Sequence, residues 1–396
     1  MIAGVPVESS PHEQRVALVP AVVPTLIKAG LQVLVEPGAG EKAGFPDAAY
    51  QEQGARLAPD RNQLFSSADL VLQVQGLTPN SAAQSPDMES FRAGQIVLGL
   101  LNPLGAPEAV RALAGKGVTA FALELLPRIS RSQSMDALTS MATVSGYKAV
   151  LLAAGALSKM YPLMMTAAGT ITPARVFVVG AGVAGLQAIA TSRRLGAVVQ
   201  AYDIRPAVKE QVESLGVKFL ELELETKAAE GSGGYASAMD EEFYRRQREM
   251  MTRAVAESDV VITTAAIPGR KAPILILKEA VGKMRPGSVI VDLAAESGGN
   301  CELTRPGETV GINGVTIMGP TNLASTIPHH ASQMYARNVT SFLQNLVKDG
   351  EVHLDLEDEI IRETLLTHQG DVVHPRVRKL LGLDASASST NGRSSS

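Results

Sequence analysis

Three glycines and one aspartate stand at a spacing that suits a dinucleotide. Gly180, Gly182 and Gly185 form G-x-G-x-x-G directly after the apolar run 175–179, and Asp203 closes the next apolar run. In such a unit the first glycine makes a tight turn, the second admits a pyrophosphate to the backbone, and the third lets a helix pack on its strand. The pattern predicts that the phosphates of a dinucleotide lie at the N-terminus of a helix.

The acid at the end of the second run distinguishes two dinucleotides. Asp203 would accept hydrogen bonds from both hydroxyls of the adenosine ribose, and its charge would repel a 2′-phosphate. The residues therefore favour NAD(H) over NADP(H), although Arg205 weakens this preference slightly. Glycines at this spacing also mark ordinary turns, but here the strand, the glycines, the helix, the second strand and the acid all agree.

A second polar group lies earlier in the chain, where Arg128, Gln133 and Asp136 share one segment. A cation, an amide and an acid together can hydrogen-bond both the donor and the acceptor faces of a carboxamide. Composition alone favours a solvated polar turn. The residues by themselves leave both interpretations open.

The surrounding elements alternate between strand and helix signals, which predicts mainly parallel sheets. A long helix rich in alanine and leucine is expected over 140–160, and another over 333–348. The first half of the chain predicts strands at 2–7, 31–36, 70–74, 96–100 and 118–122, and helices at 19–29, 47–53 and 107–116. The second half predicts six strands at 176–179, 198–202, 217–220, 260–264, 289–293 and 315–318.

This pattern predicts an α/β fold of two Rossmann-like, doubly wound domains joined by long helices, with a nucleotide in the cleft between them. The first domain would comprise 1–138 and 331–383, and the nucleotide-binding domain 139–330. A Gly-rich insertion at about 223–240 exceeds what a six-stranded sheet needs, which favours a mobile loop. The Ser-rich segment 384–396 is expected to be a disordered tail.

Composition excludes several classes of function. The 396 residues are 45% hydrophobic and carry a net charge of −4, without the basic patch that nucleic acids require. Cys301 is the only cysteine, which rules out an intrachain disulfide and favours a reducing compartment. No secretory signal and no uninterrupted apolar run of about 20 residues is expected. No metal site is expected, because the pair His329 and His330 lacks further ligands.

Three segments resemble one family. The stretch 8–20 followed by 35–40 resembles the N-terminal signature that alanine dehydrogenases share with nicotinamide nucleotide transhydrogenase α subunits. The segment 126–136 resembles the Arg-Gln-Asp loop of the transhydrogenase NAD(H)-binding component, and 233–239 is similar to that family's mobile loop. The resemblance extends from about residue 1 to residue 383.

The resemblance implies roles for particular residues. Arg128, Gln133 and Asp136 would position the nicotinamide carboxamide and its ribose without acid or base chemistry, and Gln133 would also face NADP(H) on a partner. The further contacts to NAD(H) that it implies are Gly180, Gly182, Val183, Gly185, Asp203, Ile204, Arg205, Gly234, Tyr235, Met239 and Ala266.

The chain departs from the amino-acid dehydrogenases of the same superfamily. Those enzymes carry a lysine and a histidine after two successive strands, and this chain has no lysine near Gln75 and no histidine near Asn102. Arg15, which would hold a substrate carboxylate there, remains. An alanine dehydrogenase-like enzyme and a non-catalytic NAD-binding module stay as alternatives to transhydrogenation.

The transhydrogenase resemblance implies the reaction NADH + NADP⁺ ⇌ NAD⁺ + NADPH, coupled to proton translocation. The chain would be a cytoplasmic homodimer, held on the inner face of the cytoplasmic membrane by a membrane-spanning subunit and an NADP(H)-binding β subunit. Activity would require these partners, because the chain carries one dinucleotide fingerprint.

Overall fold

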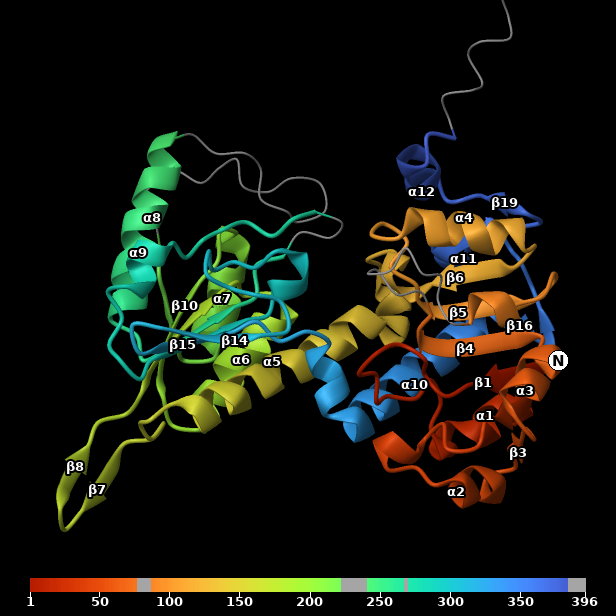
Figure 1. Ribbon diagram of the computed structural model, residues 1–396, viewed down its shortest axis with the longest axis horizontal. Helices are drawn as coiled ribbons and strands as arrows, with labels where there is room; N and C mark the ends of the chain where they lie inside the picture. The colour runs from red at the N-terminus through yellow and green to blue at the C-terminus, as the bar shows by residue number, and fades with distance from the viewer. Residues whose placement is uncertain (77–86, 222–240, 267–269, 384–396) are drawn as a thin grey trace, which may run out of the picture. The chain divides into compact units, whose positions relative to one another are not determined.

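A computed structural model describes residues 1–76, 87–221, 241–266 and 270–383 (Figure 1). The chain divides into two compact units, and the first contains Met1–Met141 and Ser325–Ser396 while the second contains Ala142–Ala324. The expected mobile loop at 223–240 and the expected tail at 384–396 lie outside the described residues.

Unit 1 is a doubly wound sheet with two strands added at one edge. Its strand order is β19-β18-β6-β5-β4-β1-β2-β3, in which β1 to β6 pair in parallel and β18 and β19 are antiparallel. The strands are β1 (Ile2–Val5), β2 (Gln32–Val35), β3 (Arg56–Leu57), β4 (Leu70–Gln75), β5 (Ile96–Leu100), β6 (Thr119–Ala122), β18 (Leu365–His368) and β19 (Asp371–Val372).

Helices cover both faces of this sheet because neighbouring strand residues point to opposite sides. Val71, Val97 and Ala120 share a core with α3, α4 and α12. On the other face Phe121 packs edge to face against Phe342 of α10. The helices of unit 1 are α1 (Val23–Lys28), α2 (Asp47–Glu52), α3 (Arg61–Ser67), α4 (Pro107–Gly115), α10 (Pro328–Leu346), α11 (Glu359–Thr364) and α12 (Pro375–Leu380).

Unit 2 has the order β11-β10-β9-β12-β13-β15-β14. Counted along the chain, its parallel strands run 3-2-1-4-5-6, which is the order of a dinucleotide-binding fold. The strands are β9 (Arg175–Val179), β10 (Val198–Tyr202), β11 (Lys218–Phe219), β12 (Val260–Thr263), β13 (Val289–Asp292), β14 (Thr309–Ile312) and β15 (Val315–Met318). The expected six strands are present, and β14 adds a seventh, antiparallel to β15.

Two separate cores sandwich this second sheet. One packs the strands against α5 and α6, and the other packs alternate strand residues against α8 and α9. The helices of unit 2 are α6 (Val183–Arg194), α7 (Lys209–Ser214), α8 (Glu241–Ala256) and α9 (Lys278–Val281), together with most of α5 (Ala137–Ala156). A short hairpin, β7 (Met164–Thr166) and β8 (Gly169–Ile171), projects away from the rest of unit 2 (Figure 1).

Helix α5 is the one helix of the described residues that is long and apolar enough to cross a membrane. Its packing is that of a core helix. A Cβ on Gly146 would lie 2.2 Å from the carbonyl oxygen of Ala184, so the backbones of α5 and α6 touch. Ala149, Val150 and Ala153 are fully buried in the core of unit 2.

Candidate dinucleotide site

The register of three neighbouring strands brings the predicted residues of unit 2 to one edge. Val179 at the end of β9 pairs with Tyr202 at the end of β10 and with Thr263 at the end of β12. The chain therefore leaves all three strands at the same level, as Gly180, Asp203 and Thr264. Ligands of open parallel sheets bind at this carboxyl edge.

The three glycines have different surroundings. Gly180 has φ 94°, in the left-handed region, and a Cβ there would lie 2.5 Å from Thr264 Oγ1. A Cβ on Gly185 would lie 1.8 Å from the carbonyl oxygen of Gly180, so the start of α6 rests directly on the turn. Gly182 meets no described atom within 4 Å and has an ordinary φ of −75°. Gly180 and Gly185 thus shape the fold, and Gly182 leaves open space.

Helix α6 begins where that open space lies. Gly182 is its N-cap and offers no side chain to the first turn, and the exposed Val183 is its first residue. The first amides of a helix have no partner within the helix, and together with the helix dipole they favour an anion. The arrangement suits a pyrophosphate over Gly182.

Asp203 is already fully engaged. Its Oδ1 accepts hydrogen bonds from the backbone N and the Nε of Arg205, at 2.9 and 3.0 Å. Its Oδ2 accepts from the backbone N of Ala181 at 2.8 Å and from Arg205 Nη2 at 3.0 Å. A carboxylate has about four acceptor positions. A ribose diol could bind Asp203 only if the Arg205 side chain moved aside. Ile204, between them, is half-buried.

Ala266 lies three residues beyond β12 and is exposed. The preceding backbone is held by Asn300, a residue that the sequence patterns did not single out. Asn300 Oδ1 accepts a hydrogen bond from Ala265 N at 3.0 Å, and its Nδ2 donates to the carbonyl oxygens of Ala265 and Pro273, both at 2.8 Å. Asn300 therefore fixes the end of β12 at the carboxyl edge.

Asn300 is held in turn by Asp292, a second residue that the patterns missed. Asp292 is fully buried at the end of β13 and accepts five hydrogen bonds. The donors are Thr263 Oγ1, Thr304 Oγ1 and the backbone N–H groups of Ala294, Asn300 and Cys301, at 2.7–3.0 Å. The available signal was a lone acid ending a strand of valine and isoleucine. Asp292 supports the site from beneath.

The second predicted group belongs to unit 1. Gln133 lies on the 3-10 helix η5 (Ser130–Met135), and both Arg128 and Gln133 are exposed. Asp136 is half-buried and caps the start of α5, where Oδ1 accepts from Thr139 N at 2.8 Å and Oδ2 from Thr139 Oγ1 at 2.6 Å. Asp136 therefore has a structural task whatever it binds.

Contacts from distant elements hold this loop in place. Arg131 Nη1 donates to Asp358 Oδ2 at 3.0 Å, just before α11. Asn338 of α10 donates from Nδ2 to the carbonyl oxygen of Ser134 at 2.9 Å. The loop is thus anchored on both sides while Gln133 stays exposed.

Arg15 is not presented to a small substrate. It is 3% exposed and bonded to Glu13, with Nε to Oε1 at 2.7 Å and Nη2 to Oε2 at 2.6 Å. Gln75 Oε1 accepts from Ser10 Oγ at 2.9 Å, and the backbone N of Asn102 donates to Glu124. The region where the related dehydrogenases hold a lysine and a histidine is bound to itself.

Two buried carboxyl groups line the same region. Burial raises the pKa of Glu8 to about 7, although the N–H groups of Val74 and Gln75 oppose the shift. Burial likewise raises the pKa of Glu124 to about 7, and backbone hydrogen bonds oppose it. Both are therefore poor places for a permanent negative charge.

The remaining predicted contacts, Gly234, Tyr235 and Met239, lie outside the described residues. Of the two histidines considered for a metal, His329 has its Nδ1 2.9 Å from the carbonyl oxygen of Ala43 and its ring stacked on Phe45. Among the described residues no group of three or more potential ligands could hold a metal ion.

Comparison with known proteins places both units in one family description. Residues 4–145 match "Alanine dehydrogenase/PNT, N-terminal domain", and residues 149–375 match "Alanine dehydrogenase/PNT, C-terminal domain".

Similar proteins include members of two kinds. One is the first of the separate polypeptides that make up the NAD(P) transhydrogenase α subunit of Rhodospirillum rubrum. The chain is 47% identical to it over 379 residues, covering 95% of this chain and 98% of that protein. It is 30% identical over 392 residues to alanine dehydrogenase of Bacillus subtilis, covering 97% and 96%. A crystal structure of transhydrogenase from Sinorhizobium meliloti has a TM-score of 0.84 at 44% identity, covering 94% of this chain and 100% of that one.

Proposed function

Because the chain belongs to the alanine dehydrogenase/PNT family, we propose that it is the NAD(H)-binding component of an NAD(P) transhydrogenase. It would pass hydride directly between its own NAD(H) and NADP(H) held by a partner polypeptide. The observation that carries NAD(H) binding is the glycine turn at the start of α6, with Asp203 at the end of the adjacent strand. The acid supports NAD(H) rather than NADP(H).

Family membership alone does not separate a transhydrogenase from an amino-acid dehydrogenase, and the interior of unit 1 favours the former. A keto acid requires a free cation and a proton donor beside the reacting carbon. Arg15 is paired with Glu13, and Gln75 and Asn102 stand where the lysine and histidine would be. Direct hydride transfer between two nicotinamide rings requires only alignment and exclusion of water.

In this function the polar loop would position the reacting nucleotide. We assign the nicotinamide carboxamide and its ribose to Arg128, Gln133 and Asp136, and the pyrophosphate to the turn at Gly182. Asp203, Ile204 and Arg205 would contact the adenosine end, with Val183, Ala266 and the residues Gly234, Tyr235 and Met239 as further contacts. No residue exchanges a proton with the substrate.

The remaining machinery would belong to other polypeptides. The name of the relative from Rhodospirillum rubrum describes it as one portion of a divided α subunit, which implies further subunits. We propose that an NADP(H)-binding β subunit and a membrane-spanning subunit complete the enzyme and couple it to proton translocation. The chain would then lie on the inner face of the cytoplasmic membrane.

The test reconstitutes the reaction from purified components. The chain is mixed with an NADP(H)-binding transhydrogenase polypeptide, NADH and an oxidised NADP analogue, and hydride transfer is followed by absorbance. We expect transfer with the partner and no NADH oxidation by the chain alone with pyruvate and ammonia. Oxidation under the latter conditions would establish the dehydrogenase instead. Tight NADH binding without transfer to any such partner would favour a non-catalytic module.

We also propose that the chain is a homodimer, on the evidence of the β7–β8 hairpin. Leu163 and Met165 are 56% and 80% exposed there, and Ile171 is 41% exposed. A two-stranded hairpin is marginally stable alone in water, so apolar side chains on such an arm favour burial by a second copy.

Met165→Asp tests the dimer directly. The variant is expected to sediment as a monomer at concentrations where the unchanged chain is a dimer, because a buried unpaired charge costs several kcal/mol (about 3–5). Analytical ultracentrifugation measures the change, with Val198→Asp, another exposed apolar residue of unit 2, as the control. A Met165→Asp dimer of unchanged stability would rule out the hairpin as the interface.

A further inference from the structure

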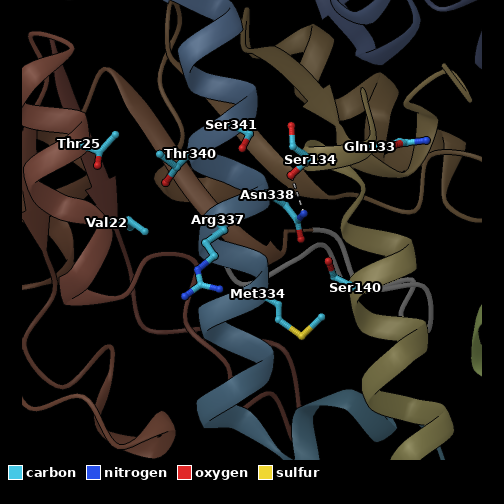
Figure 2. A pocket seen from close by; sticks show the side chains of 10 residues that line it. All are labelled: Val22, Thr25, Gln133, Ser134, Ser140, Met334, Arg337, Asn338, Thr340 and Ser341. Carbon is cyan, nitrogen blue, oxygen red and sulfur yellow. Dashed lines mark hydrogen bonds between the residues drawn. The ribbon is translucent and has the colours of Figure 1, made fainter. Parts of the chain in front are cut away.

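A pocket of about 530 Å³ lies on unit 1 beside the polar loop (Figure 2). One side is formed by α10, whose Met334, Arg337, Asn338 and Ser341 follow the i, i+3, i+4, i+7 spacing of a single helix face. Gln133 and Ser134 of η5 line it as well. The first turns of α1 and α5 complete the lining.

Two polar groups in this pocket lack partners among the described residues. Arg337 is exposed, and no acid in the described ranges forms an ion pair with it. Asn338 is 6% exposed and donates from Nδ2 to Ser134, while its buried Oδ1 accepts no hydrogen bond from any described residue. In Figure 2 that oxygen points away from Ser134. A buried acceptor without a donor costs about 1–3 kcal/mol, so the pocket suits a ligand that supplies one.

The neighbourhood of Gln133 indicates which molecule would do so, and this step rests on the proposed function. Any polypeptide that brings a second nicotinamide to Gln133 must approach the surface that Gln133 shares with the pocket. Arg337 would then be buried at the interface. A buried guanidinium is tolerated only with an acid and satisfied hydrogen bonds, and arginines so placed often dominate binding.

We propose that this pocket is a docking socket for the NADP(H)-binding partner, and that it receives an acidic side chain of that polypeptide. The acid pairs with Arg337, and an N–H group of the same segment donates to Asn338 Oδ1. Met334 supplies the apolar wall of the socket. The socket would hold the partner in register with Gln133 while taking no part in the chemistry.

Charge reversal at Arg337 tests the socket. Arg337→Glu is expected to raise the Kd for the NADP⁺-loaded partner polypeptide by about tenfold or more, and Arg337→Ala by a smaller factor. The Kd for NADH should stay unchanged. Arg376→Glu, an equal charge change at an exposed residue of α12, is the matched control. Isothermal titration at two salt concentrations should also show a weaker salt dependence for Arg337→Ala than for the unchanged chain.

Ser341→Trp supplies a second variant that fills the pocket without removing charge. It should weaken partner binding while NADH binding and the melting temperature stay unchanged. Unchanged partner binding by Arg337→Glu would overturn the proposal, even if Ser341→Trp binds weakly, because no acid would then be required. Equal losses of NADH and partner binding in Arg337→Glu would overturn it too. Failure of the unchanged chain to transfer hydride with any partner would instead refute the proposed function.

Discussion

Gly182→Ala should lower the affinity for NADH by about tenfold or more while shifting the melting temperature by no more than about 3 °C. The backbone at Gly182 is one that alanine adopts freely, and the new methyl group would meet no described atom within 4 Å. The protein therefore tolerates the change. The methyl group would stand at the start of α6, where we place the pyrophosphate, and would hold the phosphates away from the helix amides.

Gly185→Ala is the matched contrast three residues further on. Its Cβ would lie 1.8 Å from the carbonyl oxygen of Gly180, so α6 must shift, at a cost of about 3 kcal/mol in the free energy of unfolding. Chemical denaturation should show this loss for Gly185→Ala and not for Gly182→Ala. If Gly182→Ala binds NADH as tightly as the unchanged chain, the pyrophosphate does not lie over that residue.

Gln133→Ala should slow hydride transfer by about 100-fold while changing the Kd for NADH by less than about threefold. The Gln133 side chain is exposed and forms no hydrogen bond with another described side chain, so its removal should not disturb the loop. Its proposed role is to align two rings, which affects the transition state more than the bound ground state. Single-turnover kinetics with the partner polypeptide, beside equilibrium titration of NADH, measures the two quantities separately.

Ser130→Ala, an exposed residue of the same 3-10 helix, is the control for Gln133. Equal losses of transfer rate and NADH affinity in Gln133→Ala would contradict a positioning role. Asp136 is a less informative target, because its carboxylate also caps α5 through Thr139. Removing such a cap costs about 1 kcal/mol and would confuse a kinetic effect with a structural one.

The parallel strands were predictable because each is a short apolar run bounded by turn residues. The antiparallel edges were missed, although their turns carry a signal. Asn313-Gly314, Asp349-Gly350 and Gln369-Gly370 each join two strands through a pair of residues with positive φ. Asn-Gly and Asp-Gly are typical of such hairpins. The strands beside them are short or half-polar, so the hydrophobic pattern did not reveal them.

The same contrast applies to the candidate site. Gly180, Gly182, Gly185 and Asp203 follow from local spacing, because one strand, one turn and one helix place them. Asn300 depends on contacts from Ala265 to Pro273, and the pocket beside Gln133 joins residues about 200 positions apart, as in the bond from Asn338 to Ser134. No short pattern records such distant contacts.

The Arg205–Asp203 pairing has a consequence for turnover. The four acceptor positions of Asp203 are filled within the chain itself, so an arriving ribose exchanges bonds with Arg205 instead of adding to them. The gain in free energy is then the difference between two sets of hydrogen bonds, which is smaller than either set. When the nucleotide leaves, Arg205 closes the carboxylate again, and no bare charge is left behind. Such a site favours rapid exchange of spent nucleotide for fresh, as an enzyme that handles a single hydride per visit requires.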